Sequence, residues 1–244
     1  MKPPPPLDLP QIDRQPRETV NQWVYRRLRL AVMIGRIPPG RPLTIRDLAL
    51  ALEVSTMPVR EALRRLASER ALEVRDNRRI EVPVMTALKF RELCEARIAL
   101  ECHAAERALP FITADRLALL AGLDAQIDAA QAAGDRDALT LHNQAFHRAL
   151  YETNPHQVVL PLIESVWLQL GPFTRLALAR LDEFYHVDRH SEALAALRSG
   201  NPLALRVAIE ADIRDGILQV GTTELLNAYI AAGATLGTET AFGR

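Results

Sequence analysis

The chain has 244 residues, enough for one large domain or two of ordinary size. Hydrophobic residues make up 48% and charged residues 25%, a globular composition that excludes a largely disordered chain. No apolar run approaches the roughly 18–20 residues that a membrane-spanning helix needs, so no membrane partner is expected. The first residues also lack the apolar segment of a secretory signal, which predicts a cytoplasmic protein.

The cysteine content agrees with a reducing compartment. Cys94 and Cys102 lie eight residues apart on one predicted helix, a separation of ~12 Å that is too long for a disulfide. Two cysteines also exclude a zinc module built from four thiolates.

A formal net charge of zero hides an asymmetry along the chain. Residues 14–79 carry 15 arginines against 7 acidic residues, a net charge of +8. Residues 80–244 carry 14 basic and 21 acidic residues, a net charge of −7. A basic block ahead of an acidic one indicates two domains with different partners, the basic one suited to a polyanion. The alternative is that the split serves only solubility.

The sequence of the N-terminal third predicts an irregular arm followed by three helices. Six prolines within residues 1–16 favour an extended or disordered arm there. Apolar residues spaced four apart then predict a helix from Val20 that Gly35 ends. Thr44 has the side chain of an N-cap and predicts a second helix, and Ser55 or Thr56 predicts the start of a third.

Two short alternating runs, Leu72–Val74 and Ile80–Val84, follow on either side of a polar turn and predict a β-hairpin. Three helices and a hairpin over residues 17–84 describe a winged helix-turn-helix. The DNA major groove, about 12 Å wide, admits one helix, so the third helix is the predicted reading element. Arginines are available on the second and third helices and at the hairpin tip: Arg46, Arg60, Arg64, Arg65, Arg75, Arg78 and Arg79. The competing interpretation is a surface rich in arginine only because the whole chain is.

From residue 85 the pattern is helical throughout, and the chain as a whole is predicted to be mainly α. Six helices are expected, at about 86–109, 114–133, 135–153, 156–173, 177–199 and 202–221. They would form an all-helical bundle over residues 85–222, followed by a fraying tail over 223–244.

Several polar residues fall on the apolar faces of these helices. Asn143 and His147 lie one turn apart on one face, and His190 and Asp212 also point inward. A single inward histidine is more often a hydrogen-bonded core residue than a ligand. Four such groups in one bundle favour a site, because each unpaired buried polar group costs about 1–3 kcal/mol. Imidazole, carboxylate and amide ligands suit a divalent metal such as Zn, Ni or Mn.

Arg97 is a further inward charge with two interpretations. It either pairs with Glu101 one turn away, worth about 0.2–0.5 kcal/mol at a surface, or offers a guanidinium fork to the carboxylate of an effector. A metal with open positions would take the other end of a hydroxy acid, amino acid or sugar acid. His142, His186 and Asp215 are spare candidates if the helix registers differ.

The stretch from Gly35 to Leu72 resembles the DNA-binding domain of the GntR family of bacterial transcription regulators. The matching segments are Gly35–Gly40, Asp47–Ala49 and Val54–Leu63. The resemblance implies DNA contacts by Arg46, Ser55, Thr56, Met57 and Arg60, to which the hairpin position adds Arg79. The chain departs from the family pattern in having Thr56 in place of arginine, Arg70–Ala71 in place of Gly-Leu, and Arg79 in place of the wing glycine.

The helical half resembles the FCD ligand-binding domain of the FadR subfamily, through Leu93–Glu101, Asn143–Leu150, His190 and Gly200–Asn201. Many members bind a metal through one aspartate and three histidines. The resemblance therefore implies a metal site at Asn143, His147, His190 and Asp212, with the carboxylate moved to the position of the third histidine. The alternative is a hydrogen-bonded Asp–His–Asn pocket that binds its effector without metal.

We therefore expect a bacterial DNA-binding transcription regulator, a repressor by default. It would bind a palindromic operator in double-stranded DNA as a homodimer and respond to a small organic acid. Two other classes remain open: a metal-dependent hydrolase-like enzyme, and an adaptor that has lost DNA binding. An enzyme is not expected, because no positioned general base accompanies the ligand set.

Overall fold

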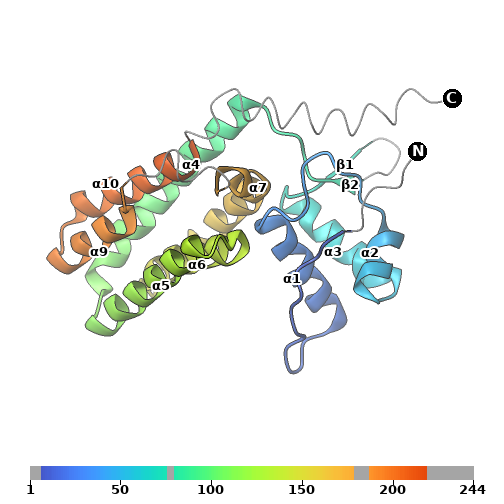
Figure 1. The fold of residues 1–244 in the computed structure, drawn as a ribbon, viewed down its shortest axis with the longest axis horizontal. Coiled ribbons are helices and arrows are strands. Elements are labelled where there is room, and N and C mark those ends of the chain that lie inside the picture. Colours follow the sequence, from blue (N-terminus) through green and yellow to red (C-terminus); the bar gives the residue numbers. More distant parts are fainter. Residues whose placement is uncertain (1–6, 76–79, 179–186, 219–244) are drawn as a thin grey trace. The chain divides into compact units, whose positions relative to one another are not determined.

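The computed structural model describes residues 7–75, 80–178 and 187–218, and the chain divides into two compact units (Figure 1). The described part of the first unit comprises residues 7–75 and 80–86, together with residues 168–172. The second comprises residues 87–167, 173–178 and 187–218. The division after Thr86 lies close to the boundary at residue 84 that the sequence predicts. The expected tail over 223–244 lies outside the described residues.

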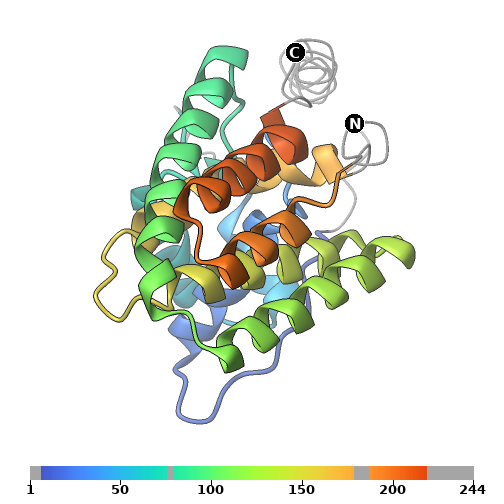
Figure 2. The ribbon, with the colours of Figure 1, turned by 90° about the vertical axis from the view of Figure 1, so that its left-hand side faces the viewer.

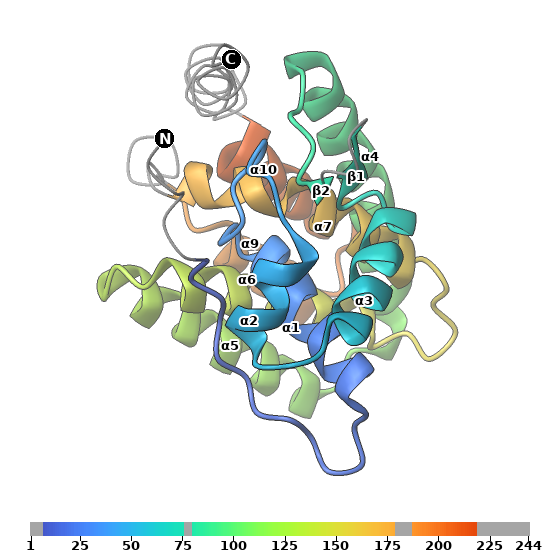
Figure 3. The ribbon, with the colours of Figure 1, turned by 90° about the vertical axis from the view of Figure 1, so that its right-hand side faces the viewer.

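The first unit contains α1 (Val20–Met33), α2 (Ile45–Leu52) and α3 (Thr56–Ser68), as the sequence predicts (Figure 3). Thr19 and Gln22 form a capping box at the start of α1, and Thr44 accepts a hydrogen bond from the Asp47 amide at the start of α2. Both α1 and α2 pack against α3. Their shared core consists of aliphatic side chains: Val24, Leu28, Leu48, Leu52, Val59, Leu63 and Leu66.

The predicted hairpin is present, with strands of two residues each: β1 (Glu73–Val74) and β2 (Ile80–Glu81). The strands are antiparallel, and Glu73 lies opposite Glu81. Like charges directly opposite each other destabilise a strand pair, and here Arg75 forms ion pairs with both carboxylates, at 2.6 and 2.7 Å. Arg78 and Arg79 lie outside the described residues.

The proline-rich arm agrees with the prediction only in part. The sequence favours an extended or disordered arm over residues 1–16, and residues 7–15 contain no helix or strand, but they lie against α1. Leu9 is buried, the Trp23 indole donates a hydrogen bond to the Ile12 carbonyl at 2.9 Å, and Arg27 Nε donates one to the Pro10 carbonyl at 2.8 Å. Proline has no backbone N–H to donate, but its carbonyl remains an acceptor for side chains of a neighbouring helix. Residues 1–6 lie outside the described part.

The second unit is helical, in agreement with the predicted bundle (Figure 2). Its elements are α4 (Ala87–Ala108), η1 (Leu109–Phe111), α5 (Ala114–Ala132), α6 (Arg136–Tyr151), α7 (Leu160–Leu178), α9 (Arg189–Ser199), α10 (Pro202–Ile213) and η2 (Arg214–Leu218). Residues 168–172 of α7 are grouped with the first unit. Four of these helices begin at a residue whose side chain caps the helix N-terminus: Thr113 for α5, Asp135 for α6, Asp188 for α9 and Asn201 for α10. Within the described ranges, no helix combines the length and apolar character that a bilayer crossing requires.

One predicted helix break is wrong. The sequence places a helix end at Gly171–Pro172, whereas α7 continues through Pro172 to Leu178. Proline inside a helix removes one backbone hydrogen bond, but Leu168, Leu170 and Phe173 around it are buried. Burial of this apolar segment therefore outweighs the local cost. The next described helix, α9, begins at Arg189 rather than near residue 177.

The helices of the second unit pack in a closed circuit. α4 contacts α6 and α10, α6 contacts α5, α5 contacts α9, and α9 contacts α10. Each of these five helices contributes at least one of the polar side chains described below. The circuit thus brings residues that are more than 100 residues apart in the sequence to the same interior.

Candidate functional site

The first candidate surface lies at the N-terminus of α3. Ser55, Thr56, Met57 and Arg60 are all exposed there, and Arg46 is exposed on α2. Ser55 occupies the N-cap position of α3, but its side chain makes no capping hydrogen bond. These five predicted DNA-contact residues therefore present their side chains to solvent.

The arginines of this unit differ in whether they already have an acidic partner. Arg64 lies 3.3 Å from Glu61, and Arg65 lies 3.2 Å from Glu69 while its guanidinium stacks on the Tyr25 ring. Arg46 and Arg60 have no ion pair with any residue that the structure describes. Arg46 and Arg60 are consequently free to bind an anion.

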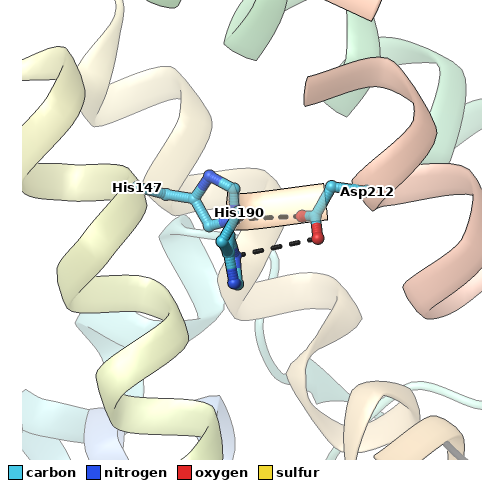
Figure 4. Close-up of side chains that lie close together, drawn as sticks. All are labelled: His147, His190 and Asp212. Carbon is cyan, nitrogen blue, oxygen red and sulfur yellow. Dashed lines mark ion pairs between the residues drawn. The ribbon is translucent and has the colours of Figure 1, made fainter. Parts of the chain in front are cut away.

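The second candidate site is buried in the helical unit and contains His147, His190 and Asp212 (Figure 4). They come from α6, α9 and α10 respectively. His147 Nε2 lies 3.1 Å from Asp212 Oδ2, and His190 Nε2 lies 3.7 Å from Asp212 Oδ1. Three of the four residues that the family resemblance implies as ligands thus meet, with potential ligand atoms all within 4.8 Å of one another.

The fourth implied ligand, Asn143, lies at the edge of this group. Asn143 lies one turn before His147 on α6, and its Nδ2 is 3.2 Å from His190 Nε2. An amide nitrogen donates and does not ligate a metal. Asn143 Nδ2 therefore provides the hydrogen-bond partner of His190 Nε2 in this structure. Of the two polar side-chain atoms of Asn143, only Oδ1 has the chemistry of a metal ligand.

The outward nitrogens of both histidines also meet polar groups. His147 Nδ1 is 3.1 Å from the Tyr151 hydroxyl, and His190 Nδ1 is 3.4 Å from Asp124 Oδ1 on α5. Metal-binding histidines commonly direct one ring nitrogen to the metal and the other to a carboxylate or similar acceptor. His147 Nε2 is fully buried and lies 3.1 Å from Asp212 Oδ2, but the pair lacks the geometry of a hydrogen bond.

Charge interactions within the site reinforce one another. Burial opposes the charged form of His190, but Asp212, Asp124 and Asp188 together raise the pKa of His190. Burial would raise the pKa of Asp212, yet His190 and His147 lower that pKa well below its ordinary value. The interior is therefore arranged to keep Asp212 ionised and to attract positive charge toward it.

Arg97 forms the expected pair with Glu101, but the pair is buried rather than exposed. Glu101 is 0% exposed and Arg97 is 9% exposed. Arg97 Nε donates to Glu101 Oε1, which also accepts from Trp167 Nε1 at 2.7 Å, while Tyr151 donates to Glu101 Oε2 at 2.8 Å. Burial lowers the pKa of Arg97, but its interactions with Glu101, Asp212 and Tyr151 together raise that pKa above its ordinary value.

Three residues of the site, Asp124, Tyr151 and Trp167, are not predicted from the sequence. Tyr151 follows His147 by four residues, so helical spacing indicates that the two side chains are neighbours. Asp124 and Trp167 carry no such signal. Of the spare candidates, Asp215 pairs with Arg189 at 2.8 Å, His142 is not among the grouped metal ligands, and His186 lies outside the described residues.

Replacing Glu101 with alanine should destabilise the fold strongly, because it leaves Arg97 as an uncompensated buried charge. The expected loss in free energy of unfolding is about 3–5 kcal/mol, measured by urea denaturation. The matched control is Glu152→Ala, which removes the carboxylate of another i, i+4 pair, Arg148–Glu152, that is exposed. That change should cost less than about 1 kcal/mol. Equal losses in the two variants would contradict the importance of burial here.

Comparison with known proteins gives two family matches. Residues 21–82 match the family described as bacterial regulatory proteins, gntR family, and residues 92–215 match the FCD domain. The chain is 32% identical over 177 residues to the HTH-type transcriptional regulator McbR of Escherichia coli K12, covering 70% of this chain and 79% of that protein. The solved structure of E. coli McbR/YncC superposes with a TM-score of 0.73 at 28% identity, over 89% of this chain and 98% of that one.

Two further relatives are named as repressors. The HTH-type transcriptional repressor RspR of E. coli K12 is 36% identical over 98 residues, 40% of this chain and 43% of that protein. The gluconate operon transcriptional repressor of Bacillus subtilis is 24% identical over 217 residues, 85% of this chain and 87% of that protein. These relatives are regulators rather than enzymes, so the hydrolase alternative is not favoured. The chain belongs to the GntR family of DNA-binding transcription regulators and carries the FCD effector-binding domain of its FadR-like branch.

Proposed function

We propose that this regulator is a cytoplasmic repressor that binds a palindromic operator as a homodimer and responds to a small organic acid bound in the helical unit. The repressor names of two relatives support the direction of regulation. Two recognition helices related by a twofold axis would read the two half-sites of the operator. The observation that carries the DNA-binding part is the exposure of Arg46 and Arg60 without ion-pair partners among the described residues.

The N-terminus of α3 has the chemistry that reading a major groove requires. Arg60 can form bidentate hydrogen bonds with guanine or phosphate, and the exposed hydroxyls of Ser55 and Thr56 suit phosphate oxygens or base edges. The exposed Met57 side chain is apolar and can contact a thymine methyl group. Arg79, outside the described residues, stays a predicted contact of the wing.

Arg60→Ala should weaken operator binding by about 1–3 kcal/mol, because a bidentate contact is lost. The measurement is a gel shift or fluorescence titration with the DNA upstream of the protein's own reading frame, at several stated salt concentrations. The wild type should lose affinity steeply as salt rises, since binding releases counterions from the phosphates.

The matched control is Arg107→Ala, which removes an exposed arginine from α4 in the helical unit. It changes the net charge by the same amount and should leave the affinity for DNA unchanged. Unaltered binding by Arg60→Ala, or equal losses in the two variants, would contradict the proposed docking of α3.

The buried site suits a divalent cation by the chemistry of its donors. His147, His190 and Asp212 supply two imidazole nitrogens and a carboxylate, a set appropriate to Zn, Ni or Mn. The unsatisfied Nε2 of His147 supports this assignment. A bound cation would supply a positive centre for the carboxylate of an effector. The competing proposal is a metal-free Asp–His–Asn pocket, which the contact between Asn143 and His190 favours.

His147→Ala should abolish metal occupancy, measured by elemental analysis after dialysis against Zn²⁺, because one of three strong ligands is gone. His142→Ala is the matched control, since it removes another histidine of the same helix that is outside the ligand group. Metal content that is unchanged in His147→Ala refutes the ligand assignment, and a wild type that binds no metal favours the metal-free pocket.

Arg97 is proposed to bind the effector carboxylate. Its Nε is committed to Glu101, but its two terminal nitrogens have no hydrogen bond with the residues described. Asp212 helps to raise the pKa of Arg97, which agrees with the guanidinium lying near the ligand group. The remaining two nitrogens form a planar pair of donors that matches a carboxylate.

A thermal-shift screen of hydroxy acids, amino acids and sugar acids should find a compound that raises the melting temperature of the wild type. A ligand at 100 times its Kd stabilises the folded state by about 2.7 kcal/mol. Arg97→Lys should lose most of this gain, because an ammonium keeps the charge but not the planar pair of donors. The ligand-free melting temperature of the variant separates binding from stability, and an equal gain in both proteins would contradict the role of Arg97.

A further inference from the structure

A continuous chain of contacts leads from the ligand group to the buried Glu101. His147 Nδ1 lies 3.1 Å from the Tyr151 hydroxyl, which lies 2.8 Å from Glu101 Oε2. Glu101 Oε2 itself is 3.9 Å from His147 Nδ1, beyond hydrogen-bond reach. The Tyr151 hydroxyl therefore bridges a gap that the carboxylate does not span. All three side chains are 0% exposed, so no bulk water competes for these contacts.

The direction of each hydrogen bond follows from the number of protons available. The Glu101 carboxylate is an acceptor, and a tyrosine hydroxyl has a single proton, which Tyr151 donates to Glu101. The Tyr151 oxygen can then only accept from His147. The hydrogen of the neutral His147 ring must accordingly be on Nδ1, and Nε2 carries a lone pair.

Glu101 is itself fixed from two other directions. Arg97 Nε, one turn earlier on α4, and Trp167 Nε1 of α7 both donate to its Oε1. With Oε1 occupied by two donors, Oε2 is left to accept from Tyr151. The orientation of the Tyr151 hydroxyl thus depends on a carboxylate that donors from α4 and α7 hold in place.

We propose that Tyr151 and Glu101 are positioning residues that hold His147 in its Nδ1–H tautomer, so that Nε2 faces Asp212 as a bare lone pair. This deepens the proposed buried site and rests on His147 being one of its ligands. Two acceptors, His147 Nε2 and Asp212 Oδ2, then face each other at 3.1 Å, an arrangement that a cation between them relieves. In this tautomer Nε2 is able to ligate a cation even when the protein is metal-free. Fixing the tautomer is the usual role of the groups that hydrogen-bond the second ring nitrogen of a metal-binding histidine.

The first test is the tautomer itself, read from the ¹⁵N chemical shifts of the histidine rings in the metal-free, full-length protein at pH 8. The His147 signals are identified by their absence from His147→Ala. The wild type should show Nδ1 protonated and Nε2 bare. Tyr151→Phe removes the acceptor for Nδ1–H, so the proton should move to Nε2, where Asp212 accepts it. A wild-type ring protonated at Nε2 overturns the proposal, as does an unchanged tautomer in Tyr151→Phe.

The second test is affinity for Zn²⁺, measured by competition with a chromophoric chelator. Tyr151→Phe should bind about 10–100-fold more weakly than the wild type, the usual effect of losing a group that orients a ligand. Tyr25→Phe is the matched control: it removes another tyrosine–glutamate hydrogen bond, to Glu69 in the first unit. It should leave both the His147 tautomer and the Zn²⁺ affinity unchanged.

The two measurements separate the failure of this inference from the failure of the proposed metal site. A wild type that binds no Zn²⁺ but has the Nδ1–H tautomer refutes the metal and retains the positioning role. A wild type that binds Zn²⁺ with a Tyr151→Phe variant of equal affinity refutes the positioning role and retains the metal. The wild-type tautomer decides the matter even if Tyr151→Phe does not fold.

Discussion

The buried carboxylate of Glu101 is the interaction on which the interior of the helical unit depends. Burying an isolated charge is prohibitively costly, and a buried ion pair is tolerated only when its remaining hydrogen-bonding positions are satisfied. Glu101 meets this condition through Arg97, Trp167 and Tyr151. These partners belong to α4, α7 and α6, so one carboxylate fixes the relative positions of three helices.

The same carboxylate connects stability to function. The residues that satisfy Glu101 are also those that orient the site: Tyr151 contacts His147, and Arg97 has two further nitrogens available for a ligand. Across the interior, Asp124 contacts the outer nitrogen of His190 in a similar way. An effector that binds the site would thereby contact a group assembled from all five helices of the circuit. It can act as a switch only if it binds the DNA-competent and incompetent states unequally.

In the DNA-binding unit, the distribution of ion pairs matters more than the number of arginines. The basic charge of residues 14–79 indicates a polyanionic partner but not which side chains meet it. Several arginines are already paired: Arg26 with Glu18, Arg64 with Glu61, Arg65 with Glu69, and Arg75 with two glutamates. Arg46 and Arg60, which have no ion pair with the residues described, lie on α2 and at the start of α3, where the proposed docking of α3 needs them.

The order of elements, most helix starts and the two classes of domain follow from the amino-acid sequence, because apolar periodicity and capping side chains are local signals. Thr44 and Asp135 mark the helix starts that they cap, and helical spacing places His147, His190 and Asp212 on inward faces. Three features depend on packing between elements: Glu101 is buried with three donors, α7 continues through Pro172, and the arm packs on α1. Trp167 and Tyr151 lie 66 and 50 residues from Glu101, and no periodicity of a single helix carries information about a partner on another.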